Sequence, residues 1–358
     1  MKGRILKISG FVVYWAIVLI PFSVAIAPAI ANVLIGYMAF FYLLKKLVNK
    51  DKAVFTHTPI NIPFLFLILF SLFSFKNSID WSDSFNGMLK LIKYAIIFFI
   101  CAAEIRDLRH VKRIVASAIS GVVLISVDGL WQLATGFDFI HRNALQSSPI
   151  GLIRPTASFP NPNVMGIYLS ALAPLVVGLA LFLKAKIRPK IALAVAALIS
   201  ALGVYITFSR GSGLGLFLSA LFLGIFKKSR VLVACLLVLL AIFPFVMPKN
   251  IKDWSQDIKF NPLVFLFNED RLAMYRNTLN MIQHHPLIGV GVNTFSKNYA
   301  KYKLPEAEKY FHTEDTTYTH NIYLQMAGEI GLLGLGAFLW LLLMFFRDNL
   351  RSFRVLKE

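Results

Sequence analysis

Residues 190–208, 209–211 and 212–226 read KIALAVAALISALGVYITF, SRG and SGLGLFLSALFLGIF, so two apolar runs are separated by one short turn. The first run has the length that a helix needs to cross a lipid bilayer. Strands of a transmembrane β-barrel would instead alternate apolar and polar residues over about ten positions. This stretch therefore predicts two membrane-spanning helices joined at the turn.

Similar apolar runs recur along the whole chain. Of its 358 residues, 57% are hydrophobic, which exceeds the 45–50% typical of soluble domains. The runs predict an all-α polytopic membrane protein with about ten transmembrane helices. The predicted spans are residues 9–27, 29–44, 59–75, 87–104, 112–133, 163–183, 190–208, 212–226, 230–247 and 321–346.

The charge distribution predicts the orientation of these spans. The net charge is +19, and the basic residues gather in short clusters between alternate apolar runs. The positive-inside rule places such clusters in the cytoplasm, so both termini are expected there. Anionic lipid headgroups are the expected partners of the clusters, and nucleic acid is not. The chain then divides into residues 1–247 with nine spans, an outer segment 248–320, and residues 321–358 with the last span and a basic tail.

Three residues on the predicted outer face of the membrane could bind or react. Arg210 follows a span and begins a small-residue turn at a helix start, where backbone N–H groups favour anions, although a snorkelling interface residue is the alternative. Arg271 follows an acidic pair in a segment whose apolar spacing predicts a helix that ends before Pro286. Taken alone, it suits a solvated face of a surface helix. His320 lies directly before the last span, where the helix dipole and nearby arginines favour a neutral imidazole.

The protonation of His320 at rest stays open at this point. Glu314 and Asp315 lie close in sequence and would favour the charged imidazolium. His312 competes for any role as a base. His284 and His285 are adjacent, but no third ligand has a suitable spacing, so no metal site is predicted.

The order of these motifs resembles the O-antigen ligase family. The resemblance rests on Ser209-Arg210-Gly211, on Arg271, on the segment His285-Pro286-Leu287-Ile288-Gly289-Val290-Gly291, and on His320 followed by Gly331. It covers about residues 150–340. The family also includes O-antigen polymerases and protein O-oligosaccharyltransferases. Many members have about twelve spans, which is more than predicted here. This difference in span number bears on the identity of the acceptor more than on the reaction.

The resemblance implies a GT-C-type inverting glycosyltransferase of the bacterial inner membrane with a periplasmic active site. It implies an undecaprenyl-diphosphate-linked glycan as donor and, for ligases, lipid A–core as acceptor. The family's essential histidine matches His320, which is expected to act as general base. Its essential arginines match Arg210 and Arg271, which are expected to bind the diphosphate, with Arg154 as a weaker third and Gly331 in a packing role. No cofactor or metal is expected, and a monomer is expected.

Three alternatives remain open from sequence. A polymerase or protein O-oligosaccharyltransferase would use the same kind of donor. A transporter for the same lipid would need a polar path through the membrane, for which Asp128 is the clearest ionisable candidate within a span. A structural subunit would present its outer segment to a partner.

Overall fold

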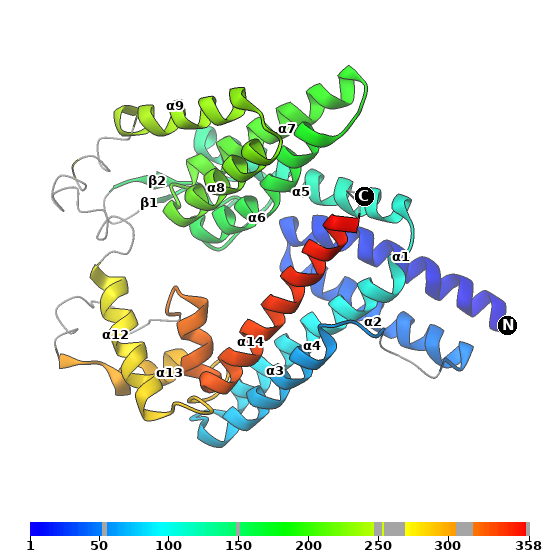
Figure 1. Cartoon of the computed structure of the whole chain (residues 1–358), viewed down its shortest axis with the longest axis vertical. Coiled ribbons are helices and arrows are strands. Elements are labelled where there is room, and N and C mark those ends of the chain that lie inside the picture. The colour runs from blue at the N-terminus through cyan, green and yellow to red at the C-terminus, as the bar shows by residue number, and fades with distance from the viewer. Residues whose placement is uncertain (52–55, 148–150, 247–252, 254–268, 306–317, 356–358) are drawn as a thin grey trace. The chain divides into compact units, whose positions relative to one another are not determined.

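The protein is all-α (Figure 1). The computed structural model describes residues 1–51, 56–147, 151–246, 253, 269–305 and 318–355. Their strands are limited to one short antiparallel pair, β1 (Gln146–Ser147) and β2 (Ile153–Arg154). The chain divides into two compact units, one comprising residues 1–51 and 104–261, the other residues 52–103 and 262–358. Each unit thus combines segments from distant parts of the sequence.

The first unit contains seven of the described helices. They are α1 (Lys2–Ile26), α2 (Pro28–Asn49), α5 (Leu108–Thr135), α6 (Pro162–Phe182), α7 (Ile187–Ile206), α8 (Arg210–Phe226) and α9 (Arg230–Val246). Its core forms where α1, α5, α6 and α7 meet, around the buried side chains of Ile125, Met165, Leu169 and Val204. Pro28 begins α2 and excludes helical geometry at Ala27, so α1 and α2 form a tight antiparallel pair.

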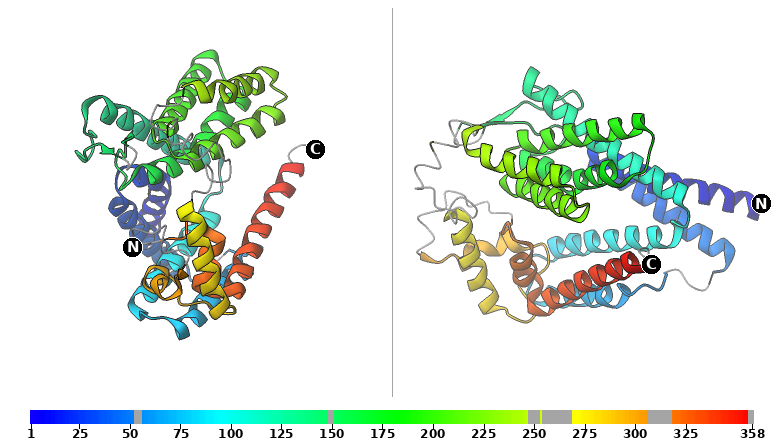
Figure 2. Two further views of the ribbon diagram at one scale, coloured as in Figure 1. Left: turned by 90° about the vertical axis from the view of Figure 1, so that its left-hand side faces the viewer. Right: turned by 45° about the horizontal axis from the view of Figure 1, so that its top comes forward.

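The second unit joins an early hairpin to the C-terminal part of the chain. Its elements are α3 (Asn61–Phe73), the 3-10 helix η1 (Ser74–Asn77), α4 (Trp81–Glu104), α12 (Glu269–His284), α13 (Phe295–Tyr299), the 3-10 helix η2 (Ala300–Tyr302) and α14 (Ile322–Val355). The helices α3, α4 and α14 lie side by side in Figures 1 and 2, and apolar side chains of all three share a core. A second core joins α12 to α13 through Met274, Met281, Phe295 and Tyr299.

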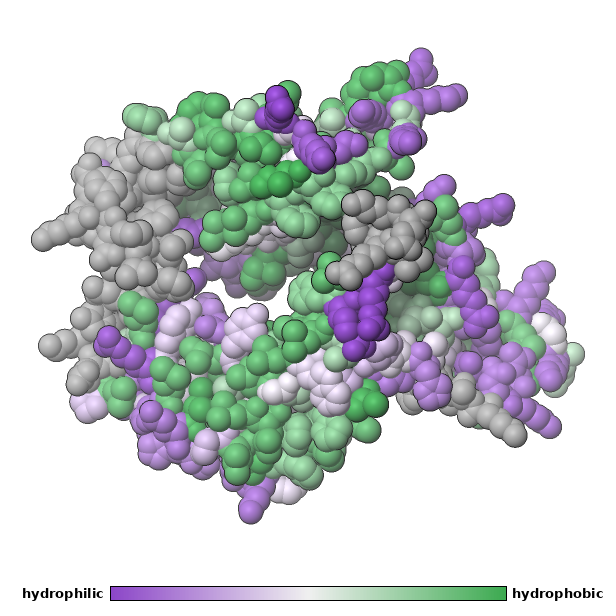
Figure 3. Space-filling view, viewed as in Figure 1, coloured by the Kyte–Doolittle hydropathy of each residue, from purple (hydrophilic) through white to green (hydrophobic). Residues whose placement is uncertain are grey.

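The helices confirm the predicted fold class. Each predicted span coincides with a described helix, and seven helices are long and apolar enough to cross a membrane by length and composition. Three more are apolar but shorter, over Asn61–Asn77, Arg210–Phe226 and Arg230–Ile242. Many large apolar side chains are exposed, and they cover the helix faces that Figure 3 draws, as expected for surfaces that contact lipid. The chain is therefore a multi-pass membrane protein, while the number of ten spans stays a prediction.

Two local expectations can also be compared with the structure. The helix predicted after the acidic pair is α12, which ends at His284 before Pro286 as expected. The last predicted span, residues 321–346, lies in α14. At Gly331 the backbone has φ 73° and ψ 179°, so α14 is interrupted within its membrane-spanning part.

Candidate functional site

The interruption of α14 is filled by the glycine-rich segment 286–291. The N–H groups of Val290 and Gly291 donate to the carbonyls of Gly328 and Glu329, at 3.0 and 2.9 Å. In return, the N–H groups of Leu332 and Leu333 donate to the carbonyls of Pro286 and Leu287, at 2.8 and 3.4 Å. Backbone groups released by a break at membrane depth need such partners because lipid supplies none.

Glycine is required on both sides of this contact. Gly331 has φ 73°, and a Cβ there would collide with the carbonyl of Leu287. Gly289 has φ 69°, and a Cβ there would lie 2.6 Å from the backbone nitrogen of Ile330. Both residues combine a left-handed conformation with close backbone approach, which glycine alone tolerates without strain. The glycines of the motif therefore lock segment 286–291 onto α14.

His285 fixes the start of the same segment. Its Nδ1 accepts from the Asn77 side-chain amide at 3.3 Å, and that amide also donates to the Gly289 carbonyl at 2.8 Å. Because Asn77 supplies the donor, the neutral ring carries its proton on Nε2, which lies 2.9 Å from the Tyr302 hydroxyl. Desolvation and the neighbouring His284 lower the pKa of His285. The geometry suits a neutral structural histidine.

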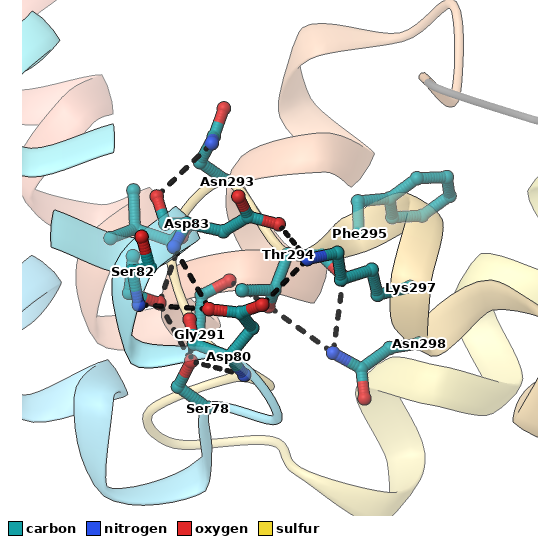
Figure 4. A network of polar contacts seen from close by, with 12 residues as sticks. Ser78, Asp80, Ser82, Asp83, Gly291, Asn293, Thr294, Phe295, Lys297 and Asn298 are labelled. Atoms are coloured by element: carbon teal, nitrogen blue, oxygen red, sulfur yellow. Dashed lines mark hydrogen bonds and ion pairs between the residues drawn. The ribbon is translucent and has the colours of Figure 1, made fainter. Parts of the chain in front are cut away.

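A polar network anchors the following residues to the start of α4 (Figure 4). The Lys297 ammonium lies 2.6 Å from Asp80 Oδ2 and 2.7 Å from Asp83 Oδ2. The Asn293 side-chain amide donates to the Asp83 carbonyl at 3.1 Å. Asp80 also accepts from the N–H groups of Ser82 and Asp83, as a helix cap does. Segment 286–298 is therefore held by α4 on one side and α14 on the other.

His320 lies in the turn that leads into α14. It is exposed and has φ 54°, a left-handed conformation that is uncommon outside glycine. The preceding Thr319 is fully buried, and its hydroxyl donates to the Asn321 carbonyl at 2.6 Å. The Asn321 side chain caps α14 by accepting from the N–H groups of Tyr323 and Leu324. The residues on both sides thus hold the backbone of His320.

Arg271 belongs to the same unit, and its charge acts on His320. It lies in the first turn of α12 and is half-buried. Desolvation by surrounding protein atoms lowers the pKa of His320, and the positive charge of Arg271 lowers it further. The ring is therefore neutral near pH 7, as a proton acceptor must be. Glu314, Asp315 and His312 lie outside the described residues.

The other two predicted arginines share the first unit. Arg210 is the first residue of α8, directly after the extended residue Ser209. Arg154 in β2 donates from Nε to the Thr207 carbonyl at 2.7 Å and from Nη2 to Asn163 Oδ1 at 2.7 Å. Desolvation lowers the pKa of Arg154. Arg154 therefore supports the turn that leads into α8, at whose first residue Arg210 lies.

Helix α6 approaches that turn closely at Gly166. A Cβ on Gly166 would lie 2.8 Å from Ser212 Oγ and 3.0 Å from both Ser209 Cβ and Thr207 Oγ1. Ser212 in turn donates to the Ser209 hydroxyl at 3.0 Å. The turn thus packs against α6 at Gly166 and is held by the hydrogen bond from Arg154 to Thr207.

The comparison with known families bears on the part of the chain that holds these elements. A family model described as O-antigen ligase (Wzy_C) matches residues 195–339. The match covers less than half of the chain and supports membership of the O-antigen ligase family. No curated protein matches the sequence. The matched range includes Arg210, Arg271, His320 and Gly331, whereas Arg154 precedes it.

The family match indicates the general chemistry. O-antigen ligase family proteins are enzymes of the glycosyltransferase type that use a lipid-linked glycan and an acceptor. The structure places His320 and Arg271 in one unit and Arg154 and Arg210 in the other. Among the residues with described positions, no group of three His, Cys, Asp or Glu side chains is arranged to hold a metal ion.

Two buried carboxylates lie in α5 and α14, and the sequence singled out only one of them. Asp128 was the ionisable span residue singled out, and its carboxylate accepts from the Phe139 N–H at 2.8 Å, which holds the loop after α5. Glu329 was overlooked, although it is a buried carboxylate near the start of α14 with Gln325 one turn before it. An ionisable residue within an apolar run is a signal that could have identified it.

Proposed function

We propose that the protein is an inverting glycosyltransferase that transfers O-antigen glycan from undecaprenyl diphosphate to lipid A–core. The observation that carries the proposal is the turn at His320, where an exposed histidine with a lowered pKa lies within the field of Arg271. A neutral imidazole at a membrane surface suits proton removal from a sugar hydroxyl. The proposal includes a bacterial inner-membrane location, cytoplasmic termini, a periplasmic site and a monomer.

The proposed reaction is a single displacement at the anomeric carbon. The acceptor hydroxyl attacks this carbon from the face opposite the diphosphate and loses its proton to the neutral imidazole of His320. A bond forms between the acceptor oxygen and the anomeric carbon while the bond to the phosphate oxygen breaks. Undecaprenyl diphosphate leaves with the electron pair, and the anomeric configuration inverts.

Arginines would bind the leaving group. A guanidinium group remains charged and matches phosphate oxygens with two parallel hydrogen bonds. We assign this role to Arg210 and Arg271, with Arg154 both supporting the turn of Arg210 and adding positive charge. Because arginines would neutralise the growing negative charge, we propose that transfer needs no metal ion. Transfer that is lost in EDTA and restored by a divalent cation would contradict this part.

The base assignment can be tested with matched histidine variants. His320→Ala should reduce the rate of glycan transfer by about 10²–10⁴-fold, the usual effect of removing a positioned base. His284→Ala is the control, because His284 is also exposed, belongs to the same unit and has its ring bonded to the Asn280 carbonyl. His312→Ala tests the competing base. Near-normal transfer by His320→Ala in correctly folded protein would refute the assignment.

The diphosphate assignment has its own test. Arg210→Lys keeps the charge but cannot form the two parallel hydrogen bonds of a guanidinium group. It should weaken donor binding and lower kcat/KM, whereas a snorkelling role would leave both unchanged. Donor affinity can be measured directly with purified protein and undecaprenyl-diphosphate glycan.

The acceptor decides between members of the family. Purified protein should be incubated with one lipid-linked glycan donor and, separately, with lipid A–core, a second lipid-linked glycan or an acceptor protein. Transfer to lipid A–core supports the ligase, and transfer to the other two acceptors supports the polymerase or the protein O-oligosaccharyltransferase. Movement of the donor across vesicles without any transfer would support a transporter.

A further inference from the structure

A buried carboxylate links the glycine-rich segment to α14. The Glu329 residue is 8% exposed. Its Oε2 accepts from the Asn293 N–H at 2.7 Å, and its Oε1 accepts from the Phe295 N–H at 3.4 Å and from Gln325 Nε2 at 2.6 Å. All three partners are donors, which suits a carboxylate that only accepts hydrogen bonds.

The same link extends to the turn that carries His320. The Oε1 atom of Gln325 accepts from the Thr319 N–H at 3.0 Å. Gln325 therefore uses its amide nitrogen toward Glu329 and its amide oxygen toward the backbone just before His320. A side-chain amide that is bonded at both ends has its orientation fixed.

The conformation of His320 explains why such a link matters. At φ 54° the backbone of His320 departs from the conformations that this residue favours, and residues of this kind need surrounding structure to hold them. The Asn321 cap holds the following residue. Gln325 holds the preceding one, and Glu329 in turn fixes Gln325 against segment 293–295.

We propose that Glu329 is a positioning residue that, through Gln325, holds the His320 imidazole in place for proton transfer. Glu329 contacts neither reacting atom in this role. A purely structural role would predict that its loss lowers stability and protein yield without a specific effect on the catalytic step. A positioning role predicts a lower kcat at unchanged donor KM, because a base displaced by about 1 Å can cost 10²-fold in rate.

The inference rests on the proposed function, so its test includes a measurement that does not require activity. The variants are Glu329→Gln, which places a donor where two N–H groups point, and Gln325→Leu, which keeps the two backbone bonds of Glu329. Met326→Leu is the control, because it changes the neighbouring residue of α14 with little change in volume. Each full-length variant is purified in detergent and compared in thermal unfolding, transfer kinetics and NMR titration of the His320 ring. The His320→Ala variant assigns the NMR signal among the seven histidines.

Both Glu329→Gln and Gln325→Leu should lower kcat by about 10²-fold with KM unchanged. The His320 titration should move toward the value of an ordinary exposed histidine, because the ring leaves its protein surroundings. The exchange Gln325→Glu/Glu329→Gln restores one amide–carboxylate bond and should recover part of the rate, whereas Met326→Leu should behave like the unmodified protein.

Two results would overturn the inference. An unchanged titration of His320 in folded Glu329→Gln and Gln325→Leu proteins would show that the link does not hold the ring. Loss of the fold in both variants would show that the link is structural. If the titration moves as expected but His320→Ala still transfers glycan, the positioning link stands and the base assignment fails.

Discussion

Replacing Gly331 by alanine should destabilise the second unit strongly. The residue has φ 73° and ψ 179°, and alanine in such a conformation costs about 1–3 kcal/mol. A Cβ would also collide with the Leu287 carbonyl, which places the hydrogen bonds of Leu332 and Leu333 to segment 286–291 at risk. At about 0.5–1.5 kcal/mol for each of these two bonds, the total loss is about 2–6 kcal/mol.

Gly336 in the same helix is the matched control. Nothing lies within 4 Å of a Cβ at Gly336, so Gly336→Ala should be neutral or stabilise the helix by about 0.5–1 kcal/mol. Equilibrium unfolding in mixed detergent micelles, followed by tryptophan fluorescence, measures both variants. Equal stability of Gly331→Ala and Gly336→Ala would refute the reasoning that segment 286–291 and the broken helix depend on each other.

Three further outcomes are expected. Transfer by the unmodified protein should fall only below the ordinary pKa of histidine, about 6.5, because the lowered pKa keeps His320 neutral down to that range. Arg271→Gln removes a positive charge and should move the acid limb of the pH–rate profile to higher pH. Arg271→Lys keeps the charge and should leave the acid limb in place. Gly166→Ala should displace the turn before α8 and raise the donor KM, whereas Gly178→Ala, where a Cβ meets only atoms at 3.9 Å or more, should not. Lys297→Met removes two exposed ion pairs and should change thermal stability little, and the difference should be smaller still at high salt. A large loss of stability would show that this network contributes more than surface ion pairs usually do.

The helices were predictable from sequence because a bilayer imposes length and apolarity on each one separately. Helix α12 was equally readable, since an acidic pair marks its first turn and Pro286 follows its end. These signals are local, so one sequence suffices to read them.

The break in α14 was not predictable in the same way. Glycine is common in membrane helices, where it usually permits close packing, so the sequence predicted a packing role for Gly331. A broken helix is stable only when another segment supplies hydrogen bonds, and that segment is 286–291. The contact also defines the roles of Gln325 and Glu329, whose partners lie in loops that no periodicity predicts.

The candidate site residues remain a prediction from sequence. Arginines and a histidine on the predicted outer face indicated an anionic lipid substrate. The protonation of His320 was not predictable, because it depends on desolvation and on the distance to Arg271. The support of the Arg210 turn by Arg154 likewise depends on a contact to the Thr207 carbonyl.

The broken helix also constrains the biogenesis of the protein. Residues 286–291 leave the ribosome before residues 328–333, so the loop is made before the helix whose backbone it completes. When the last apolar segment enters the bilayer, its middle cannot satisfy its own hydrogen bonds at Gly331. Insertion of this segment is therefore complete only after it has found the earlier loop, which couples the membrane integration of α14 to the folding of segment 286–291.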